Sequence, residues 1–227
     1  MRQKNWSSLA EVLHTIEQCT PYLILRNYEE LTDEKYYMAG HEDIDFLVQD
    51  SAKVRRALQA RNDLWYRSHD HCFIVIKGVD VKIGLRYVGD GYYDRAWEME
   101  MLRKRRLHPE GFYVMDDEDY FYSLLYHALL QKRIFQEDYR IRLKEMGRAF
   151  NIILDKEEDY KKCLFQYLIK CGYWVEYPRD VNVPINYADV PQQLLKGYFR
   201  WKVCRYLRKG SNRIYKIYEK MRHRIEK

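Results

Sequence analysis

Two short segments of the chain alternate between hydrophobic and polar residues, a period of two that is typical of half-buried β-strands. In the first, residues 40–48, Asp43 and Asp45 share one face and apolar residues fill most of the other. In the second, residues 79–85, Asp80 lies on the polar face. Because successive side chains of a strand point to opposite faces, the pattern predicts two strands that each present carboxylates on one side.

The second alternating segment follows a further apolar strand, residues 72–76, and the dipeptide Lys77-Gly78. A two-residue connection that contains glycine predicts a tight turn, so we expect the two strands to form an antiparallel hairpin. Period-two alternation then places Lys82 beside Asp80. Lys82 in that position either binds a phosphate or forms an ordinary salt bridge with Asp80.

Helical spacing and strand-like runs complete the first half of the chain. The predicted elements are a helix over residues 8–19 that stops at Thr20-Pro21, a buried strand over residues 22–25, a helix capped by Asp50-Ser51, and a turn at Gly89-Asp90-Gly91. The order of these elements along the chain is mixed α/β.

Beyond about residue 95 the hydrophobic spacing becomes helical. The acidic run 116–119 suits a helix N-terminus, and apolar residues surround most of the following turns, so we predict a central core helix there. His127 in this helix is expected to be a hydrogen-bonded core histidine, with a functional role only if it faces a cleft. A second amphipathic helix is predicted over residues 160–168, followed by a proline-containing loop over residues 177–191.

These patterns predict an α/β (α+β) fold in two domains. We expect a small mixed sheet with helices over residues 1–105 and a helical C-terminal half over residues 106–227.

Composition supports a folded, soluble chain. The 227 residues are 47% hydrophobic and 33% charged, a balance that excludes the disordered class. The sequence has no 18-residue apolar run and its start lacks the apolar core of a signal peptide, so we expect a cytoplasmic protein. The five cysteines are odd in number and lack C-x2-C spacing, which predicts reduced, mostly buried thiols.

Positive charge is concentrated at the C-terminus. Residues 196–227 hold 12 Lys and Arg against two acids, whereas the rest of the chain holds 28 bases and 32 acids. The tail has the spacing of a basic amphipathic helix, so we expect it either to contact an anionic membrane surface or a polyanionic glycan carrier, or to pack on the domain. Nucleic acid is disfavoured as a partner because the aromatic residues of the tail lack regular spacing.

The three carboxylates of the alternating segments suit a divalent metal. Mg²⁺ takes oxygen ligands, usually one or two carboxylates plus substrate phosphates. Three carboxylates are able to bridge two ions, which together assist an in-line displacement at phosphorus. Asp43, Asp45 and Asp80 therefore predict one or two Mg²⁺ ions and phosphoryl chemistry. The alternative is that the acids form the solvated face of an edge strand.

A family resemblance rests on three segments: residues 23–26, Gly40-His41-Glu42-Asp43-Ile44-Asp45-Phe46-Leu47-Val48, and Val79-Asp80-Val81. Over residues 10–90 the chain resembles the nucleotidyltransferase superfamily, whose pattern is a glycine-serine turn, then D-h-D, then a third acid on a later strand. The resemblance implies that Asp43 and Asp45 are metal ligands. It also implies that Asp80 is the third acid, which assists deprotonation of the acceptor hydroxyl or binds a second metal.

One motif departs from the family pattern. The glycine-serine turn is replaced by Arg26-Asn27-Tyr28, so we expect the side chain of Arg26 or Asn27 to bind phosphate where the family uses backbone. Lys82 and Arg86 are the other cations expected near phosphates. No G-x-x-x-x-G-K-[ST] or G-x-G-x-x-G motif occurs, which excludes a P-loop and a dinucleotide fold.

The function these features favour is metal-dependent transfer of a nucleotidyl or phospho-substituent from a nucleotide or nucleotide-linked donor to a hydroxyl acceptor. In outline the chain resembles the phosphocholine and polyol-phosphate transferases of this fold and proteins of bacterial surface-polysaccharide clusters, which implies a glycan precursor as acceptor. One alternative is a small nucleotidyltransferase that modifies a protein or an antibiotic. Another is a non-catalytic binding scaffold, which the missing glycine-serine favours and the three acids disfavour.

Overall fold

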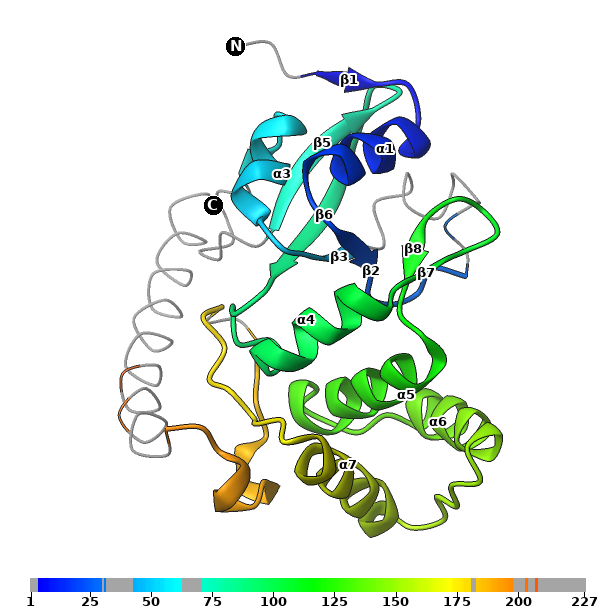
Figure 1. The fold of residues 1–227 in the computed structure, drawn as a ribbon, viewed down its shortest axis with the longest axis vertical. Coiled ribbons are helices and arrows are strands. Elements are labelled where there is room, and N and C mark those ends of the chain that lie inside the picture. Colours follow the sequence, from blue (N-terminus) through cyan, green and yellow to red (C-terminus); the bar gives the residue numbers. More distant parts are fainter. Residues whose placement is uncertain are drawn as a thin grey trace, which may run out of the picture.

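The computed structural model describes residues 4–29, 31, 43–62, 71–180, 183–197, 203 and 207. The predicted mixed α/β architecture is confirmed: eight strands of the described residues form one mixed sheet, in the order β1-β5-β6-β3-β2-β8-β7 with β4 beside β5 (Figure 1). The strands are β1 Asn5–Trp6, β2 Tyr22–Ile24, β3 Ile44–Val48, β4 Arg61–Asn62, β5 His71–Ile76, β6 Val79–Tyr87, β7 Arg106–Leu107 and β8 Tyr113–Val114.

The centre of the sheet contains the two alternating segments. β3 runs parallel to β6, with Asp45 opposite Gly84, and antiparallel to β2. The predicted hairpin is confirmed, because β5 and β6 pair antiparallel across a two-residue turn. Lys77 and Gly78 in that turn have φ angles of 51° and 80°, the left-handed conformation that such turns require at both positions.

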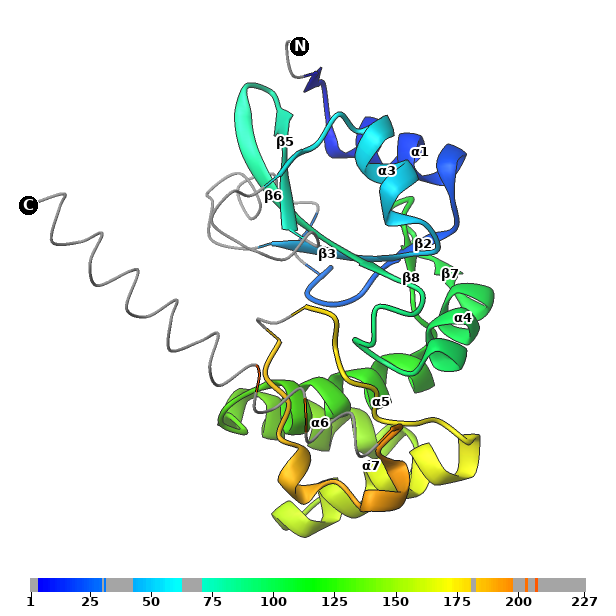
Figure 2. The same ribbon diagram turned by 90° about the vertical axis from the view of Figure 1, so that its left-hand side faces the viewer.

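Two helices cover one face of the sheet, α1 Leu9–Cys19 and α3 Ser51–Ala57 (Figure 2). The Ser8 hydroxyl accepts the Glu11 N–H at the start of α1, and Asp50 accepts the Lys53 N–H at the start of α3. Both helices therefore lie where the sequence predicts them, and the Asp50 cap is confirmed. Their apolar sides pack on the inward residues of the central strands, among them Phe46, Ile83 and Leu85.

The helical part of the chain lies on the other side of the sheet and consists of α4 Arg95–Lys104, α5 Asp117–Tyr126, a π-helix His127–Gln131, α6 Glu137–Ala149, α7 Glu157–Cys171 and two 3₁₀ turns, Tyr187–Asp189 and Gln192–Leu194. α5 is the predicted central helix. Asp116 caps it by accepting the Asp119 N–H, and seven of its side chains are buried.

The hydrophobic core of the helical part extends onto the sheet. Leu23, Leu25 and Leu47 point to this side and pack with residues of α4, α5 and α7. The boundary predicted after residue 105 falls between α4 and β7, and the sheet continues beyond it because β8 pairs in parallel with β2.

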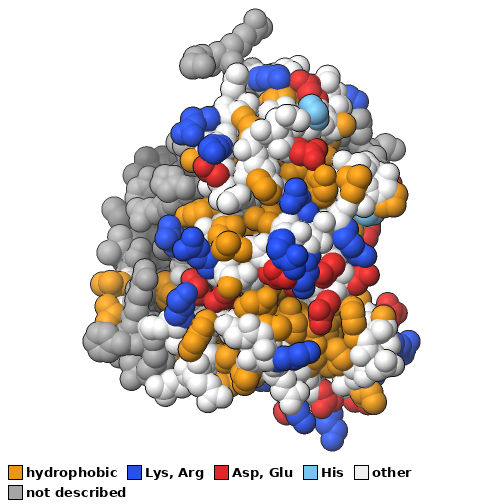
Figure 3. Space-filling model, viewed as in Figure 1, with side chains coloured by type: hydrophobic (Ala, Val, Ile, Leu, Met, Phe, Trp, Pro, Cys, Tyr) orange, Lys and Arg blue, Asp and Glu red, His pale blue; other side chains and the backbone are white. Residues whose placement is uncertain are grey.

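Acidic and basic side chains are interspersed on the face drawn in Figure 3. Arg103 pairs with Glu100, and Arg106 pairs with Asp117, each at 2.5 Å. The basic tail, residues 196–227, lies almost wholly outside the described residues, so its expected contact with a membrane or a polyanion stays a prediction. Within the described residues, no helix has the length and apolar character needed to cross a membrane.

The cysteines that the structure describes are free thiols. Cys72 is buried, Cys19 and Cys163 are half-buried and Cys171 is exposed, so the expected burial holds in full for Cys72 alone among these four. Desolvation raises the pKa of the Cys163 and Cys171 thiols above its ordinary value, which keeps both protonated at neutral pH.

Candidate functional site

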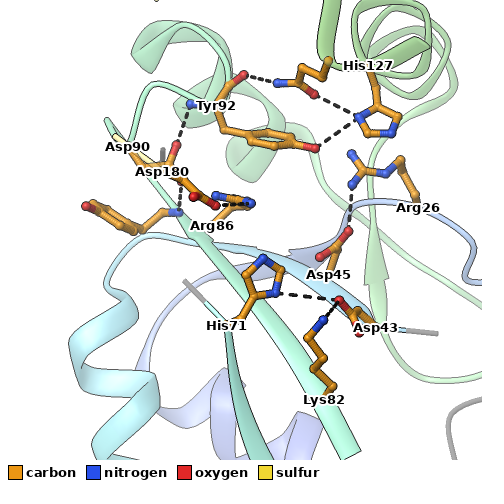
Figure 4. A network of polar contacts seen from close by, with 12 residues as sticks. Arg26, Asp43, Asp45, His71, Lys82, Arg86, Asp90, Tyr92, His127 and Asp180 are labelled. Atoms are coloured by element: carbon orange, nitrogen blue, oxygen red, sulfur yellow. Dashed lines mark hydrogen bonds and ion pairs between the residues drawn. The ribbon is translucent and has the colours of Figure 1, made fainter. Parts of the chain in front are cut away.

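Asp43 and Asp45 project together from the sheet face that meets the helical part (Figure 4). Asp45 lies on β3 and Asp43 immediately precedes it; residues 40–42 of the predicted strand lie outside the described residues. The side chains of Asp43 and Asp45 are 30% and 23% exposed, so solvent reaches both. The expectation that alternation brings these two acids to one face is confirmed.

Each of the two carboxylates has a cation beside it. The Leu25 N–H donates to the Asp45 carbonyl, which places the next residue, Arg26, beside Asp45. The Nη2 atom of Arg26 lies 2.7 Å from Asp45 Oδ2. Lys82 on β6 places its Nζ 2.7 Å from Asp43 Oδ2. The salt bridge predicted between Lys82 and Asp80 is therefore wrong in its partner, because Lys82 reaches across to the parallel neighbour strand.

Gly84 separates Asp45 from His71 in one row across three strands. It is opposite Asp45 on β3 and opposite His71 on β5. A Cβ at position 84 would lie 2.2 Å from Asp45 Oδ1, so the carboxylate occupies the space that the glycine leaves. His71 Nδ1 lies 3.7 Å from Asp43 Oδ2, and burial, followed by the positive charge of Arg86, lowers the pKa of this imidazole.

Asp80 does not join the acid pair, which corrects the prediction of a third acid there. It precedes Gly84 on β6 by four residues, or about 13 Å of extended strand. Its carboxylate pairs instead with Arg61 at 2.6 Å, and both side chains are more than half exposed. The parallel register between β3 and β6 causes this separation, because it places Lys82 and Gly84, rather than Asp80, beside the pair.

Arg86 lies one pleat beyond Gly84 on the same face of β6 and pairs with Asp180, a residue that no local sequence pattern had indicated. The Arg86 Nη2 to Asp180 Oδ2 distance is 3.0 Å, and both side chains are buried. Two guanidinium groups lie near the ring of Tyr92, whose centroid is 4.5 Å from Arg86 Cζ and 5.6 Å from Arg26 Cζ. These contacts extend the polar site from the acid pair into the protein interior.

Asn27 is exposed and contributes a turn to the site. Its φ angle is 54°, a left-handed conformation that asparagine adopts more readily than most residues. Thus Asn27 takes a backbone conformation that glycine would otherwise supply. Its expected role in binding phosphate through the side chain stays a prediction.

Tyr92 also connects the site to the π-helix. Its hydroxyl lies 3.2 Å from His127 Nδ1, which lies 3.0 Å from Gln131 Oε1, and Gln131 Nε2 donates to the Tyr92 carbonyl. Since Gln131 uses its amide nitrogen for that bond, its oxygen accepts and His127 Nδ1 carries the proton. Burial holds the pKa of His127 well below its ordinary value. The expectation of a hydrogen-bonded core histidine is confirmed.

Asp43 and Asp45 offer two partly exposed carboxylates on one strand face. Arg26 pairs with Oδ2 of Asp45, and Lys82 and His71 both lie nearest to Oδ2 of Asp43. Two carboxylates completed by substrate phosphates and water are a usual set of ligands for Mg²⁺. Among the described residues, no group of three or more Asp, Glu, His or Cys side chains is arranged to hold a metal, so the two-ion arrangement has no support there.

Comparison of the chain with protein-family models, curated proteins and solved structures found no match. The likeness to the nucleotidyltransferase superfamily therefore rests on its motif residues and stays a prediction.

Proposed function

We propose that the protein is a metal-dependent transferase that moves a nucleotidyl or phospho-substituent from a nucleotide donor to a hydroxyl of its acceptor. The observation that supports this is the accessible pair Asp43 and Asp45 on one strand face, with Arg26 and Lys82 beside it. Such a site offers oxygen ligands to a cation and N–H donors to phosphates. The acceptor class, a surface-glycan precursor, follows from the resemblance alone.

Asp43 and Asp45 would hold one Mg²⁺, which when bound would neutralise charge on the donor phosphates. Lys82, 26% exposed, is placed to exchange its contact with Asp43 for a phosphate oxygen. The Arg26 guanidinium, 9% exposed, would orient Asp45 and add positive charge beside the donor phosphates. Positioning and charge stabilisation supply most of the acceleration in phosphoryl transfer, so the chain needs no covalent nucleophile.

A binding scaffold without catalysis is the second candidate, and one observation favours it. Both carboxylates already have a cation within 2.7 Å, and Asp80 lies elsewhere. In such a scaffold the two ion pairs would serve only to hold β3 against β6 and against the turn after β2. Magnesium binding separates the two candidates, because a scaffold has no need of it.

The experiment is a thermal-shift titration with Mg²⁺ alone, then with nucleoside triphosphates and cytidine-diphosphate-linked donors. We expect the unfolding midpoint of the wild type to rise with Mg²⁺ and further with a donor, because a ligand of the native state stabilises it by about 2.7 kcal/mol at 100 times its Kd. Asp43→Asn and Asp45→Asn should each abolish the rise, since each removes a charged ligand.

Asp80→Asn is the matched control. It removes an aspartate from the same sheet face, but its carboxylate pairs with Arg61 at an exposed position and not with Arg26 or Lys82, so the response to Mg²⁺ should be that of the wild type. A wild type that is indifferent to Mg²⁺ and to every donor would leave the scaffold as the better proposal.

A further inference from the structure

On the sheet face that carries Asp43 and Asp45, three ion pairs join a buried or half-buried Arg or Lys to a carboxylate. Two of them, Arg26 with Asp45 and Lys82 with Asp43, join residues of neighbouring strands or of the turn after β2. The third differs because Asp180 comes from the segment that follows α7 and lies 94 positions from Arg86 in the chain. Asp180 is 4% exposed, so its carboxylate is a fixed interior charge and not a surface partner.

The backbone holds this segment in position. The Arg179 N–H donates to the Asp90 carbonyl at 2.8 Å. Gly91 lies so close to Tyr177 that a Cβ on it would be 2.6 Å from the Tyr177 carbonyl oxygen. The Asp90 carboxylate in turn accepts the Tyr92 N–H at 2.7 Å. Asp180 is thus held against the Gly-Asp-Gly turn that carries Tyr92.

Arg86 has three carboxylates near it, those of Asp90, Asp180 and Asp45. Burial by itself lowers the pKa of Arg86, but Tyr92, Asp90, Asp180 and Asp45 more than offset it and raise that pKa above its ordinary value. A buried guanidinium needs a carboxylate partner, because an uncompensated buried charge is strongly destabilising. The Asp90 carboxylate already accepts the N–H groups of Tyr87 and Tyr92. Without Asp180, the acid on the sheet face that would pair with Arg86 is therefore Asp45 (Figure 4).

We propose that Asp180 is a positioning residue that binds Arg86 and so keeps the carboxylate of Asp45 available to a ligand. The proposal rests on the proposed function for the nature of that ligand, a magnesium ion with donor phosphates. Its electrostatic part is independent of any ligand: Asp180 and Asp45 are alternative partners of one cation.

A ligand-free double-mutant cycle tests the electrostatic part. Asp180→Asn, Asp45→Asn and the double variant are unfolded thermally at pH 7. In Asp180→Asn we expect Arg86 to turn to Asp45, so the midpoint of the double variant should fall by more than the sum of the two single effects. Additive effects would overturn the proposal. Asp117→Asn, which breaks the exposed pair with Arg106, is the control and should combine additively with Asp45→Asn.

A magnesium titration tests the consequence for the site. We expect Asp180→Asn to weaken Mg²⁺ binding about 10- to 100-fold, the usual effect of removing a group that orients a metal ligand. Asp180→Glu should retain binding, and Arg86→Met in the Asp180→Asn background should restore it, because the competing cation is gone. Binding that stays weak in this double variant would overturn the positioning role.

The proposed function and the positioning role of Asp180 are tested by different outcomes. A wild type that binds no Mg²⁺ would overturn the proposed function, while the ligand-free cycle would still decide whether Asp180 and Asp45 share Arg86. A merely structural Asp180 would lower the midpoint without coupling to Asp45 and without a recovery of Mg²⁺ binding on removal of Arg86. Circular dichroism at 25 °C checks that each variant is folded before titration.

Discussion

The carboxylate of Asp45 lies over the backbone of Gly84, where any other residue would place its Cβ. This contact positions the acid between β3 and β6 and next to Arg26. Gly84 has an ordinary strand conformation, so the reason for a glycine here is space and not backbone freedom. A glycine inside a strand often marks such a close approach.

Gly84→Ala should therefore displace the Asp45 carboxylate. We expect a loss of about 1–3 kcal/mol in the free energy of unfolding, as for other insertions into packed sites, together with a loss of the Mg²⁺ response. Urea unfolding measures the first and the thermal-shift titration the second. An alanine variant that keeps the full Mg²⁺ response would show that the site does not depend on this position of Asp45.

Single residues of the site differ in how far the sequence predicts them. Asp43 and Asp45 follow from period-two alternation, which is a local property of one strand. His71 and Asp180 do not, because their positions depend on which strands are neighbours, in which register, and on a return of the chain after α7. The prediction for Asp80 is wrong for the same reason: alternation specifies its face, but only the parallel pairing of β3 with β6 specifies its neighbours.

At the scale of elements, the π-helix that follows α5 carries His127 and Gln131, which contact Tyr92 of the site. A π-helix widens the turn, and such segments often occur at functional sites. Here it brings His127 and Gln131 to the Tyr92 hydroxyl and carbonyl. The lowered pKa of His127 means that the folded protein keeps this imidazole neutral below the pH at which an unfolded chain protonates it.

The sign of the resulting pH dependence follows from proton counting. Below the unfolded-state pKa of about 6.5, the unfolded chain binds a proton that His127 in the folded protein does not, so stability falls as the pH falls. The slope for one full proton is about 1.4 kcal/mol per pH unit. Urea unfolding between pH 7.5 and pH 5.5 should show a shallower loss in His127→Gln than in the wild type.

Comparing the wild type with His127→Gln separates the contribution of His127 to the pH dependence from those of other titrating groups. His71 also has a lowered pKa and contributes with the same sign, whereas Glu98, whose pKa burial raises, contributes with the opposite sign. Both groups remain in the variant. Equal slopes in the two proteins would contradict a neutral, buried His127.

Elements with a strong local signal are predicted well, and short ones are not. The end of α1 at Thr20, the Asp50 cap of α3, the hairpin turn at Lys77-Gly78 and the acidic start of α5 are local and lie where expected. The two-residue strands β4, β7 and β8 are too short to show a period, and their pairing comes from distant neighbours. The π-helix is a single widened turn, which is likewise too short to show a period of its own.

At the scale of the whole molecule, the sheet has a core on each face. One lies beneath α1 and α3, and the other lies between the sheet and the helical part. In the second core, Trp97 of α4 stacks on Tyr173, with ring centroids 5.4 Å apart, and donates to Asp119 of α5 at 2.8 Å. The Arg86–Asp180 pair adds a buried electrostatic link between the same two parts.

This arrangement gives an expectation for the boundary predicted after residue 105. A fragment of residues 1–105 would expose Leu23, Leu25, Leu47 and Trp97, and it would lose β8, the neighbour of β2. An exposed apolar sheet face and a new open edge favour association over folding. The fragment should therefore lack a cooperative thermal transition and bind a hydrophobic dye, whereas the full chain should unfold in one transition. A fragment that unfolds cooperatively as a monomer would establish two independent domains, and would mean that the site at Asp43 and Asp45 forms without the charge of Asp180.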